Sequence, residues 1–384
     1  MRIALMGTRG IPANYGGFET FYENLGPGLA ARGHEVTVYI RPHAVGKVVG
    51  NEYRGVHLVR MPSITTKHLE TITHTLASVL HGLTRRYDVV YVCGVGNTPL
   101  VWVPRLRRGK VVLNVDSADW KRKKWGRFAA TYLHATERFA SRAADVIVAD
   151  SQVIQARYAA DYAADARFFP YGANLVDAAG TETLVRYGLR PRGYALWVGR
   201  LEPEANVEEL IRAFASLGPT DHKLVIVGDS PYAGDYREKL KALANEDVVF
   251  TGYQFGDAYR ELGYHAFAYV QTSPTSGTSP ALLDQMAAGG AVIVRGTPTN
   301  LEVIGDTGLA YDPKDGTAGL AALLGQLMSD PAMADRLRAA ARQRVATVYS
   351  WDRIIDDYER LFAELLGRAD PGSAQPRRDS DRGE

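Results

Sequence analysis

Short apolar stretches alternate with longer amphipathic stretches along most of this chain, and that alternation is the feature that most constrains its fold. In the first half, the apolar stretch Arg2–Met6 leads into a helical pattern from about Phe18 to Arg32 that ends at Gly33. Such alternation is typical of βαβ units, in which helices cover both faces of a parallel sheet. The pattern predicts strands at Arg2–Met6, Glu35–Ile40, Gly55–Arg60, Asp88–Cys93, Lys110–Val115 and Asp145–Ala149, and a second helix over Thr71–Thr84.

The same pattern starts again at Tyr194–Val198, so we expect an α/β protein of two doubly wound parallel-sheet domains. The chain has 384 residues, which is enough for two domains with sizeable cores. We place the domains at residues 1–174 and 175–349, a last helix at 350–367 and a polar, disordered tail at 368–384. The further strands expected are Lys223–Val227, Val248–Thr251, Ala266–Gln271 and Ala291–Val294, and the helices are Val207–Leu217, Tyr236–Asn245, Pro280–Ala288, Thr317–Met328 and Ser350–Leu366.

Composition excludes several classes of protein. The single cysteine, Cys93, rules out an internal disulfide framework, and no apolar run is long enough to span a bilayer. The sequence also has no signal peptide, so a cytoplasmic protein is expected. Residues 1–180 carry 23 Lys/Arg against 14 Asp/Glu, so the first half is expected to meet an anionic partner. We expect no nucleic acid, because no nucleic-acid-binding motif is present; an anionic membrane or a phosphorylated acceptor fits this charge.

The first strand runs into a glycine-rich loop, GTRGIPANYGGFET, at residues 7–20. Glycines allow close approach of the backbone to a ligand, and the N–H groups at a helix N-terminus favour phosphate. Gly16 and Gly17 are therefore candidates for a donor or phosphate site. A long βα loop with glycine turns is the alternative, since the spacing is not that of the dinucleotide fingerprint.

Ligands of open parallel sheets bind beyond the carboxyl ends of the strands, so two such domains are expected to face each other across a cleft. Arg200 follows a strand and could clamp a diphosphate; the alternative is a surface arginine paired with Glu202 or Glu204. Asp284, four residues into a helix, could accept hydrogen bonds from a ribose diol, or could be an exposed aspartate behind a helix cap. The start of that helix is a candidate phosphate site through Gly277, Thr278 and Ser279.

The segment NVDSADWKRKKWGR, residues 114–127, follows another strand. Asp116 is a candidate catalytic residue that could orient an acceptor hydroxyl or act as a base. On the acceptor side we place Asp119, Trp120, Lys121 and Arg122. Tryptophans beside lysines suit an anionic membrane surface at residues 120–127, and a solvated loop is the alternative. The histidines show no metal-ligand spacing, so no metal site is expected.

Together these motifs resemble the GT-B glycosyltransferases of family 4. Within that family the chain is similar to the capsule and exopolysaccharide rhamnosyltransferase-like group. The shared runs are GTRGIPA-x-YGGFET at Gly7–Thr20, the partial DG-x-EWKR-x-KW match at Asp116–Trp125, PYGA at Pro170–Ala173, GRLEPE at Gly199–Glu204 and the helix start at Gly277–Asp284.

The resemblance implies two Rossmann-like domains, with a last helix that crosses back to the first domain. It implies a retaining enzyme that binds a nucleotide diphosphate sugar mainly in its C-terminal domain and a saccharide acceptor in its N-terminal domain, without a cofactor or metal. The expected transfer moves a hexose or deoxyhexose, with rhamnose as one candidate, from a dTDP- or UDP-sugar in cell-surface polysaccharide assembly. A polyprenyl-diphosphate-linked acceptor would place the protein on the inner face of the membrane.

The chain departs from the broad family at three positions. Where the family has a Glu-x7-Glu pair, this chain has Ser276 and Asp284, and Ala205 stands where a lysine usually follows the GRL arginine. These departures favour a deoxy sugar as donor. They also leave open a catalytically silent GT-B protein that binds a glycan or partner, or a sugar-nucleotide epimerase of the same fold.

Overall fold

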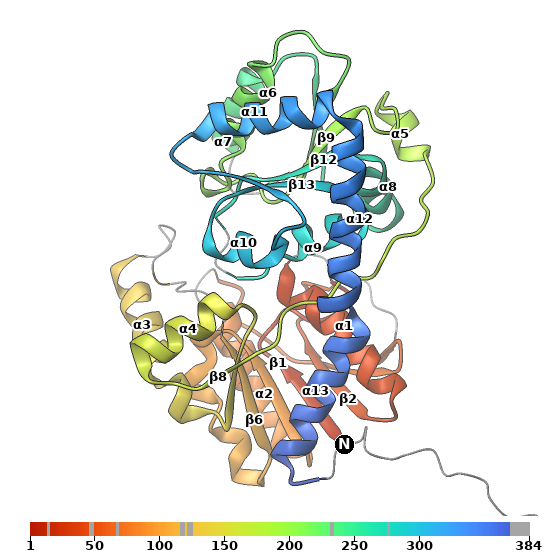
Figure 1. The fold of residues 1–384 in the computed structure, drawn as a ribbon. Helices are drawn as coiled ribbons and strands as arrows, with labels where there is room; N and C mark the ends of the chain where they lie inside the picture. The colour runs from red at the N-terminus through yellow and green to blue at the C-terminus, as the bar shows by residue number, and fades with distance from the viewer. Residues whose placement is uncertain are drawn as a thin grey trace, which may run out of the picture. The chain divides into compact units, whose positions relative to one another are not determined.

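The computed structural model describes residues 1–13, 16–45, 50–66, 69–115, 120, 126–230, 234–274 and 277–368, apart from the side chain of Phe128. The chain divides into two units (Figure 1). Unit 1 consists of Met1–Asp150, Ile154–Phe169 and Asp352–Glu384, and unit 2 of Ser151–Val153 and Pro170–Trp351. The chain therefore passes from unit 1 to unit 2 after Phe169 and returns to unit 1 after Trp351. The sequence placed the corresponding domain boundaries after residues 174 and 349.

Unit 1 is built on an eight-stranded sheet in the order β3-β4-β2-β1-β5-β6-β7-β8. Every neighbouring pair is parallel except β3–β4. The central strands are buried apolar runs, as expected of a parallel sheet covered on both faces. The strands are β1 (Arg2–Met6), β2 (Glu35–Ile40), β3 (Glu52–Tyr53), β4 (Val56–Arg60), β5 (Val89–Cys93), β6 (Lys110–Val115), β7 (Val146–Ala149) and β8 (Ala166–Phe168).

One face of this sheet is covered by α2 (Glu70–Gly82), α3 (Arg127–Ala143) and α4 (Gln152–Tyr162). Val79, Leu133 and Tyr158 from these three helices join one core with side chains of β5, β6 and β7. The 3-10 helices η1 (Val95–Leu100) and η2 (Val103–Arg107) belong to the same layer, where η1 packs against both α2 and α3 and η2 packs against α2.

The other face is covered by α1 (Gly17–Ala31) and by the last helix, α13 (Trp351–Leu365). Tyr91 points to this face because its neighbours on β5 point into the core on the first face. The Tyr91 and Tyr358 hydroxyls lie 3.0 Å apart, and the Tyr22 hydroxyl donates to the Met6 carbonyl at 2.6 Å. Arg32, the C-cap residue of α1, forms ion pairs with Asp356 and Glu359 on α13, so the C-terminal helix is held on unit 1.

Unit 2 contains a six-stranded sheet in the order β11-β10-β9-β12-β13-β14, with every pair parallel. Its core gathers Trp197, Leu210 and Phe214 against β10 and β12. The strands are β9 (Tyr194–Val198), β10 (Lys223–Val227), β11 (Val248–Gly252), β12 (Ala268–Gln271), β13 (Ala291–Arg295) and β14 (Leu309–Tyr311). The helices are α5 (Glu182–Arg186), η4 (Pro203–Ala205), α6 (Val207–Ala215), α7 (Gly234–Leu243), α8 (Gly256–His265), α9 (Pro280–Ala287), α10 (Pro298–Ile304), α11 (Gly316–Ser329) and α12 (Pro331–Val348).

The expected fold class, two doubly wound parallel sheets, is confirmed. Each strand and helix expected from the sequence is present, with its ends within about two residues of the expected positions. The sequence did not predict α3, α4, α5, α8, α10 and α12, nor the short strands β3, β8 and β14. Among the described helices, none combines the length and the apolar character needed to cross a bilayer.

Candidate active site

Each sheet has one point where the strand order reverses, and this is where doubly wound folds bind ligands. In unit 1 the chain passes from β1 outward to β2, and β5 lies on the other side of β1. In unit 2 it passes from β9 to β10, and β12 lies on the other side of β9. The loops after β1 and β5, and those after β9 and β12, therefore form the candidate site of each unit.

The glycines directly after β1 serve packing rather than ligand approach. Gly7 has φ +93°, and a Cβ atom there would lie 2.6 Å from the Cys93 carbonyl oxygen. Gly10 has φ +106°, and its Cβ atom would lie 2.4 Å from a methyl carbon of Ile40. Both positions therefore require glycine because the loop lies against the neighbouring strands and because the backbone is left-handed.

Gly16 and Gly17 start α1, as the sequence suggested. Gly16 is the N-cap residue, with extended backbone and no side-chain cap, and Gly17 is the first helical residue. The first turn already contains the buried carboxylate of Glu19, which accepts a hydrogen bond from the Arg9 N–H at 3.0 Å. A carboxylate at this helix start complements the helix dipole and favours hydroxyl groups over phosphate as neighbours.

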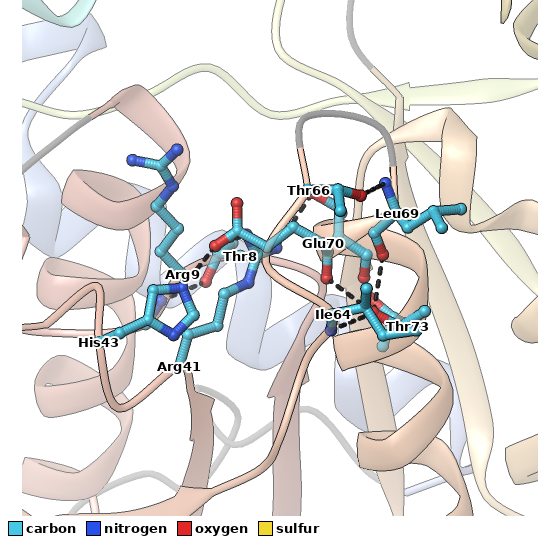
Figure 2. Close-up of polar contacts among 12 residues, drawn as sticks. Thr8, Arg9, Arg41, His43, Ile64, Thr66, Leu69, Glu70 and Thr73 are labelled. Atoms are coloured by element: carbon cyan, nitrogen blue, oxygen red, sulfur yellow. Dashed lines mark hydrogen bonds and ion pairs between the residues drawn. The ribbon is translucent and has the colours of Figure 1, made fainter. Parts of the chain in front are cut away.

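A charged cluster that sequence reasoning missed joins the loops after β1 and β2 to the start of α2 (Figure 2). The Arg41 N–H donates to the Arg9 carbonyl at 2.9 Å, and Arg41 Nη1 lies 3.4 Å from Glu70 Oε1. The same carboxylate oxygen lies 2.7 Å from His43 Nε2. Arg41 is buried, and its position directly after β2 was the available sequence signal.

The pKa values in this cluster follow from burial and charge. Burial alone would raise the pKa of Glu70, but the hydrogen bond from His43 and the charge of Arg41 hold that pKa below its usual value. Burial, together with the charge of Arg41, lowers the pKa of His74 to about 4. His74 is therefore neutral at pH 7, and Glu70 supplies the countercharge of the buried guanidinium.

Two buried asparagines lie where β5 and β6 end. Asn114 is the penultimate residue of β6 and donates to the Tyr91 hydroxyl at 2.8 Å, and Asn97 on η1 donates to the Cys93 carbonyl at 2.8 Å. The amide oxygens of both have no hydrogen-bond partner within the part of the chain that the structure describes. Buried acceptors without partners are uncommon in folded proteins. These two amide oxygens therefore give this edge of the sheet a polar character.

The catalytic candidate Asp116 and three of the expected acceptor-side residues, Asp119, Lys121 and Arg122, lie outside the described residues. Trp120 is described, and its indole N–H donates to Glu137 on α3 at 2.6 Å. Its ring also contacts the ring of His134, with the centroids 4.6 Å apart. Trp120 is thus anchored on α3 and only partly exposed.

In unit 2, Arg200 stands two residues after β9. Arg200 Nη1 lies 3.4 Å from Glu202 Oε1, which is the surface pairing that the sequence left open as the alternative. The Arg200 side chain is 41% exposed, and an ion pair at such a site contributes little stability. The guanidinium can therefore leave Glu202 for a stronger anionic partner at small cost.

The loops after β9 and β12 are tied together. Thr272, the residue after β12, donates to the Ala205 carbonyl at 2.6 Å and accepts from the Trp197 indole at 3.0 Å. Helix α9 begins after the same loop, with Pro280 in its first position and Ser279 Oγ accepting from the Leu282 N–H at 3.4 Å. Arg200 and the start of α9 thus flank the point where the strand order reverses.

Asp284 is neither an exposed aspartate nor a freely ionised one. It is half-buried, and Asp284 Oδ2 accepts a hydrogen bond from the Tyr259 hydroxyl on α8 at 3.2 Å. Burial raises the pKa of this carboxyl to about 7, although the Tyr259 hydrogen bond acts in the opposite direction. The carboxyl is therefore about half protonated near neutral pH and can donate as well as accept.

Comparison with known proteins agrees with this architecture. Residues 189–344 match the family model of glycosyl transferases group 1, and residues 1–174 match a domain of unknown function, DUF1972. Sucrose-phosphate synthase from Thermosynechococcus elongatus superimposes with a TM-score of 0.81 at 22% identity, covering 95% of this chain and 99% of that one. Anabaena Alr3699/HepE, in complex with UDP and glucose, superimposes with a TM-score of 0.74 at 17% identity over 96% of this chain and 99% of that chain.

Two curated relatives add sequence similarity. The GDP-mannose-dependent alpha-(1-6)-phosphatidylinositol monomannoside mannosyltransferase of Mycolicibacterium smegmatis is 28% identical over 90% of this chain and 94% of its own length. The O-antigen chain mannosyltransferase B of Escherichia coli is 29% identical, but that match covers 38% of this chain and 40% of the relative.

The fold and these matches define the class: the chain is a glycosyltransferase with the GT-B fold. More particularly, residues 189–344 form a domain of the glycosyl transferases group 1, and residues 1–174 form a domain of the DUF1972 type.

Proposed function

We propose that this enzyme transfers a hexose or deoxyhexose from a nucleotide diphosphate sugar to a saccharide acceptor, with retention of anomeric configuration. The observation that carries the proposal is that Arg200 follows β9 and the start of α9 follows β12, the two neighbouring strands at the strand-order reversal of unit 2. A guanidinium and the N–H groups of a helix N-terminus are the groups that bind a diphosphate.

The chemical step requires stabilisation of a leaving diphosphate. In the proposed mechanism, Arg200 releases Glu202 and binds the diphosphate bidentately, while the N–H groups at Gly277–Ser279 and the α9 dipole face the same charge. Asp284, with its pKa of about 7, contacts the ribose hydroxyls and can donate or accept. Asp116 orients the attacking acceptor hydroxyl, and Asp119, Trp120, Lys121 and Arg122 lie on the acceptor side.

The donor base is proposed to be uracil or thymine. The solved structure of HepE with UDP and glucose supports a uridine nucleotide. The broad family has a lysine and two glutamates where this chain has Ala205, Ser276 and Asp284. These changes favour a donor sugar with fewer hydroxyls. Rhamnose on dTDP is therefore the particular deoxy sugar that we propose for this chain.

The acceptor is proposed to be a lipid-linked saccharide of cell-surface polysaccharide assembly, with a polyprenyl diphosphate as its carrier. The relatives named for a phosphatidylinositol monomannoside and for an O-antigen chain support an acceptor of this kind. The excess of basic residues in the first half supports an anionic acceptor or membrane. Residues 120–127, which we expect at the inner face of the membrane, lie mostly outside the described residues.

A thermal-shift screen against dTDP, UDP, GDP and their sugars tests the donor. Binding to the folded state raises the melting temperature by mass action, and dTDP or UDP should give the largest shift. Arg200→Gln should abolish the shift, whereas Arg260→Gln, which removes an exposed arginine paired with Asp257 on α8, should preserve it. Absence of any nucleotide shift contradicts the proposal. Nucleotide binding without sugar transfer to any saccharide would favour a silent GT-B protein or an epimerase.

A further inference from the structure

Among the described residues of unit 1, the large exposed apolar side chains come from one layer of helices and the segments beside them. Within the described part of the unit, the large exposed apolar residues come from α2 and the segment before it, from η2 with the residue before it, and from α3. They are Ile64, Leu69, Leu76, Leu80, Trp102, Leu106, Tyr132 and Phe139. The opposite layer, formed by α1 and α13, contributes none of them among its described residues.

The elements that carry these residues pack against one another in one layer of unit 1. Helix η2 packs against α2, and η1 packs against both α2 and α3. Arg105 on η2 also donates to the Ala143 carbonyl at the end of α3, at 3.3 Å. We call the outer side of α2, η2 and α3 the α2–η2–α3 surface.

The apolar side chains at the centre of this surface are well exposed. Leu106 is 64% exposed, Phe139 is 56% exposed, and Trp102 is 52% exposed. Leu69, Leu76 and Leu80 recur at spacings of seven and four residues, which places them on one side of α2. Grouped exposed apolar residues of this kind, with a tryptophan among them, are a mark of an interaction surface.

The charge of the same surface is positive. Six exposed arginines have no ion pair among the described residues. They stand on the elements of this surface or within four residues of their ends: Arg85, Arg86, Arg107, Arg108, Arg138 and Arg142. The acidic residues of α2 and α3 are Glu70 and Glu137, and both are engaged, Glu70 with Arg41 and Glu137 with Arg157. The Glu137 side chain is fully buried. No acidic side chain on these helices therefore neutralises the arginines.

We propose that the α2–η2–α3 surface docks on an anionic lipid surface. Leucine, phenylalanine and tryptophan side chains enter the boundary between headgroups and acyl chains, while arginines beside them face anionic headgroups. An acidic protein partner would also bind these arginines, but its binding would not require lipid. The vesicle experiment therefore separates a lipid surface from a protein partner. The inference rests on the proposed function, because docking on lipid would bring the enzyme to a lipid-linked acceptor.

Co-sedimentation with phosphatidylcholine vesicles, with and without phosphatidylglycerol, measures the docking directly. The full chain should bind the anionic vesicles and release them at high salt. The variant L106S/R107Q should bind at least about tenfold more weakly, because one arginine near an anionic surface contributes about fivefold and the exposed leucine adds to it.

A matched control exists on α5 in unit 2. Val185 is 77% exposed, and Arg186 is exposed without an ion pair among the described residues. V185S/R186Q therefore also replaces an exposed aliphatic residue by serine and the next arginine by glutamine, away from the surface. This control should bind vesicles as the unchanged protein does. Thermal shifts with dTDP or UDP should be equal in all three proteins, which separates a failure of docking from a failure of donor binding.

Three results would overturn the inference. The first is equal binding to neutral and anionic vesicles, or no binding to either. The second is unchanged binding of L106S/R107Q. The third is loss of binding when Lys121–Lys124 are neutralised while L106S/R107Q binds normally, because the contact would then lie in residues 120–127 and not on the α2–η2–α3 surface.

Discussion

Replacing Asp284 by asparagine should make the stability of unit 2 less dependent on pH. Burial raises the pKa of this carboxyl from 3.8 to about 7 in the folded protein. Between these two pH values the unfolded chain has lost the proton and the folded chain retains it. Stability therefore falls as pH rises through this window and becomes level above about pH 7. A shift of this size corresponds to roughly 4 kcal/mol, at about 1.4 kcal/mol for each unit of pKa.

Asparagine keeps the size of the side chain and can still accept from the Tyr259 hydroxyl, but it does not ionise. The free energy of unfolding of D284N, relative to the unchanged protein, should therefore rise between pH 4.5 and pH 7.5 by an amount on the order of 2–4 kcal/mol. Urea denaturation at a series of pH values measures this difference. Asp306→Asn, at an exposed position in unit 2, is the control and should show no such trend. A difference for D284N that stays constant across the window would refute the assignment of a raised pKa.

Two further predictions concern unit 1 and the chain near its junctions. Glu70→Gln removes the countercharge of buried Arg41 and should destabilise unit 1 by about 3 kcal/mol at pH 7. This loss of stability should shrink as pH falls through the lowered pKa of Glu70. The control E35Q, at an exposed position, should change the stability little. Gly172→Ala should lower the free energy of unfolding by about 1–3 kcal/mol, because its Cβ atom would lie 2.7 Å from Trp351 Cδ2. The control G126A should not lower it, because no described atom lies within 4 Å of the added Cβ atom. Equal melting temperatures for the two alanine variants would contradict this packing argument.

The sequence predicted the sheets well because the central strands are short apolar runs, some of them rich in β-branched residues, such as Val89–Cys93 and Lys223–Val227. It missed α3, whose apolar residues are interrupted by His134, Glu137 and Arg138. Helix α3 is stabilised by its packing against the sheet rather than by its local sequence pattern.

The positions of candidate residues were predictable where they depend on strand ends and helix starts, as for Arg200 after β9 and Ser279 at the N-cap of α9, and their roles stay predictions. It was not predictable where it depends on partners distant in the chain. Arg41 and Glu70 are separated by nearly thirty residues, and only the fold brings them together. Tyr259 likewise reaches Asp284 from another helix, and a pattern of single residues contains no signal for a raised pKa.

Sugar transfer by purified protein tests the central claim most directly. The enzyme would be incubated with a dTDP- or UDP-sugar and with a lipid extract that contains saccharide-linked polyprenyl diphosphates, and release of the nucleotide and labelling of the lipid would be followed. We predict transfer with retained anomeric configuration. The rate should fall by about tenfold to a hundredfold in R200Q, since hydrogen bonds to a charged leaving group contribute about 1.5–3 kcal/mol. The control R260Q should be as active as the unchanged enzyme. Transfer of equal rate in R200Q, or a product of inverted configuration, would contradict the account.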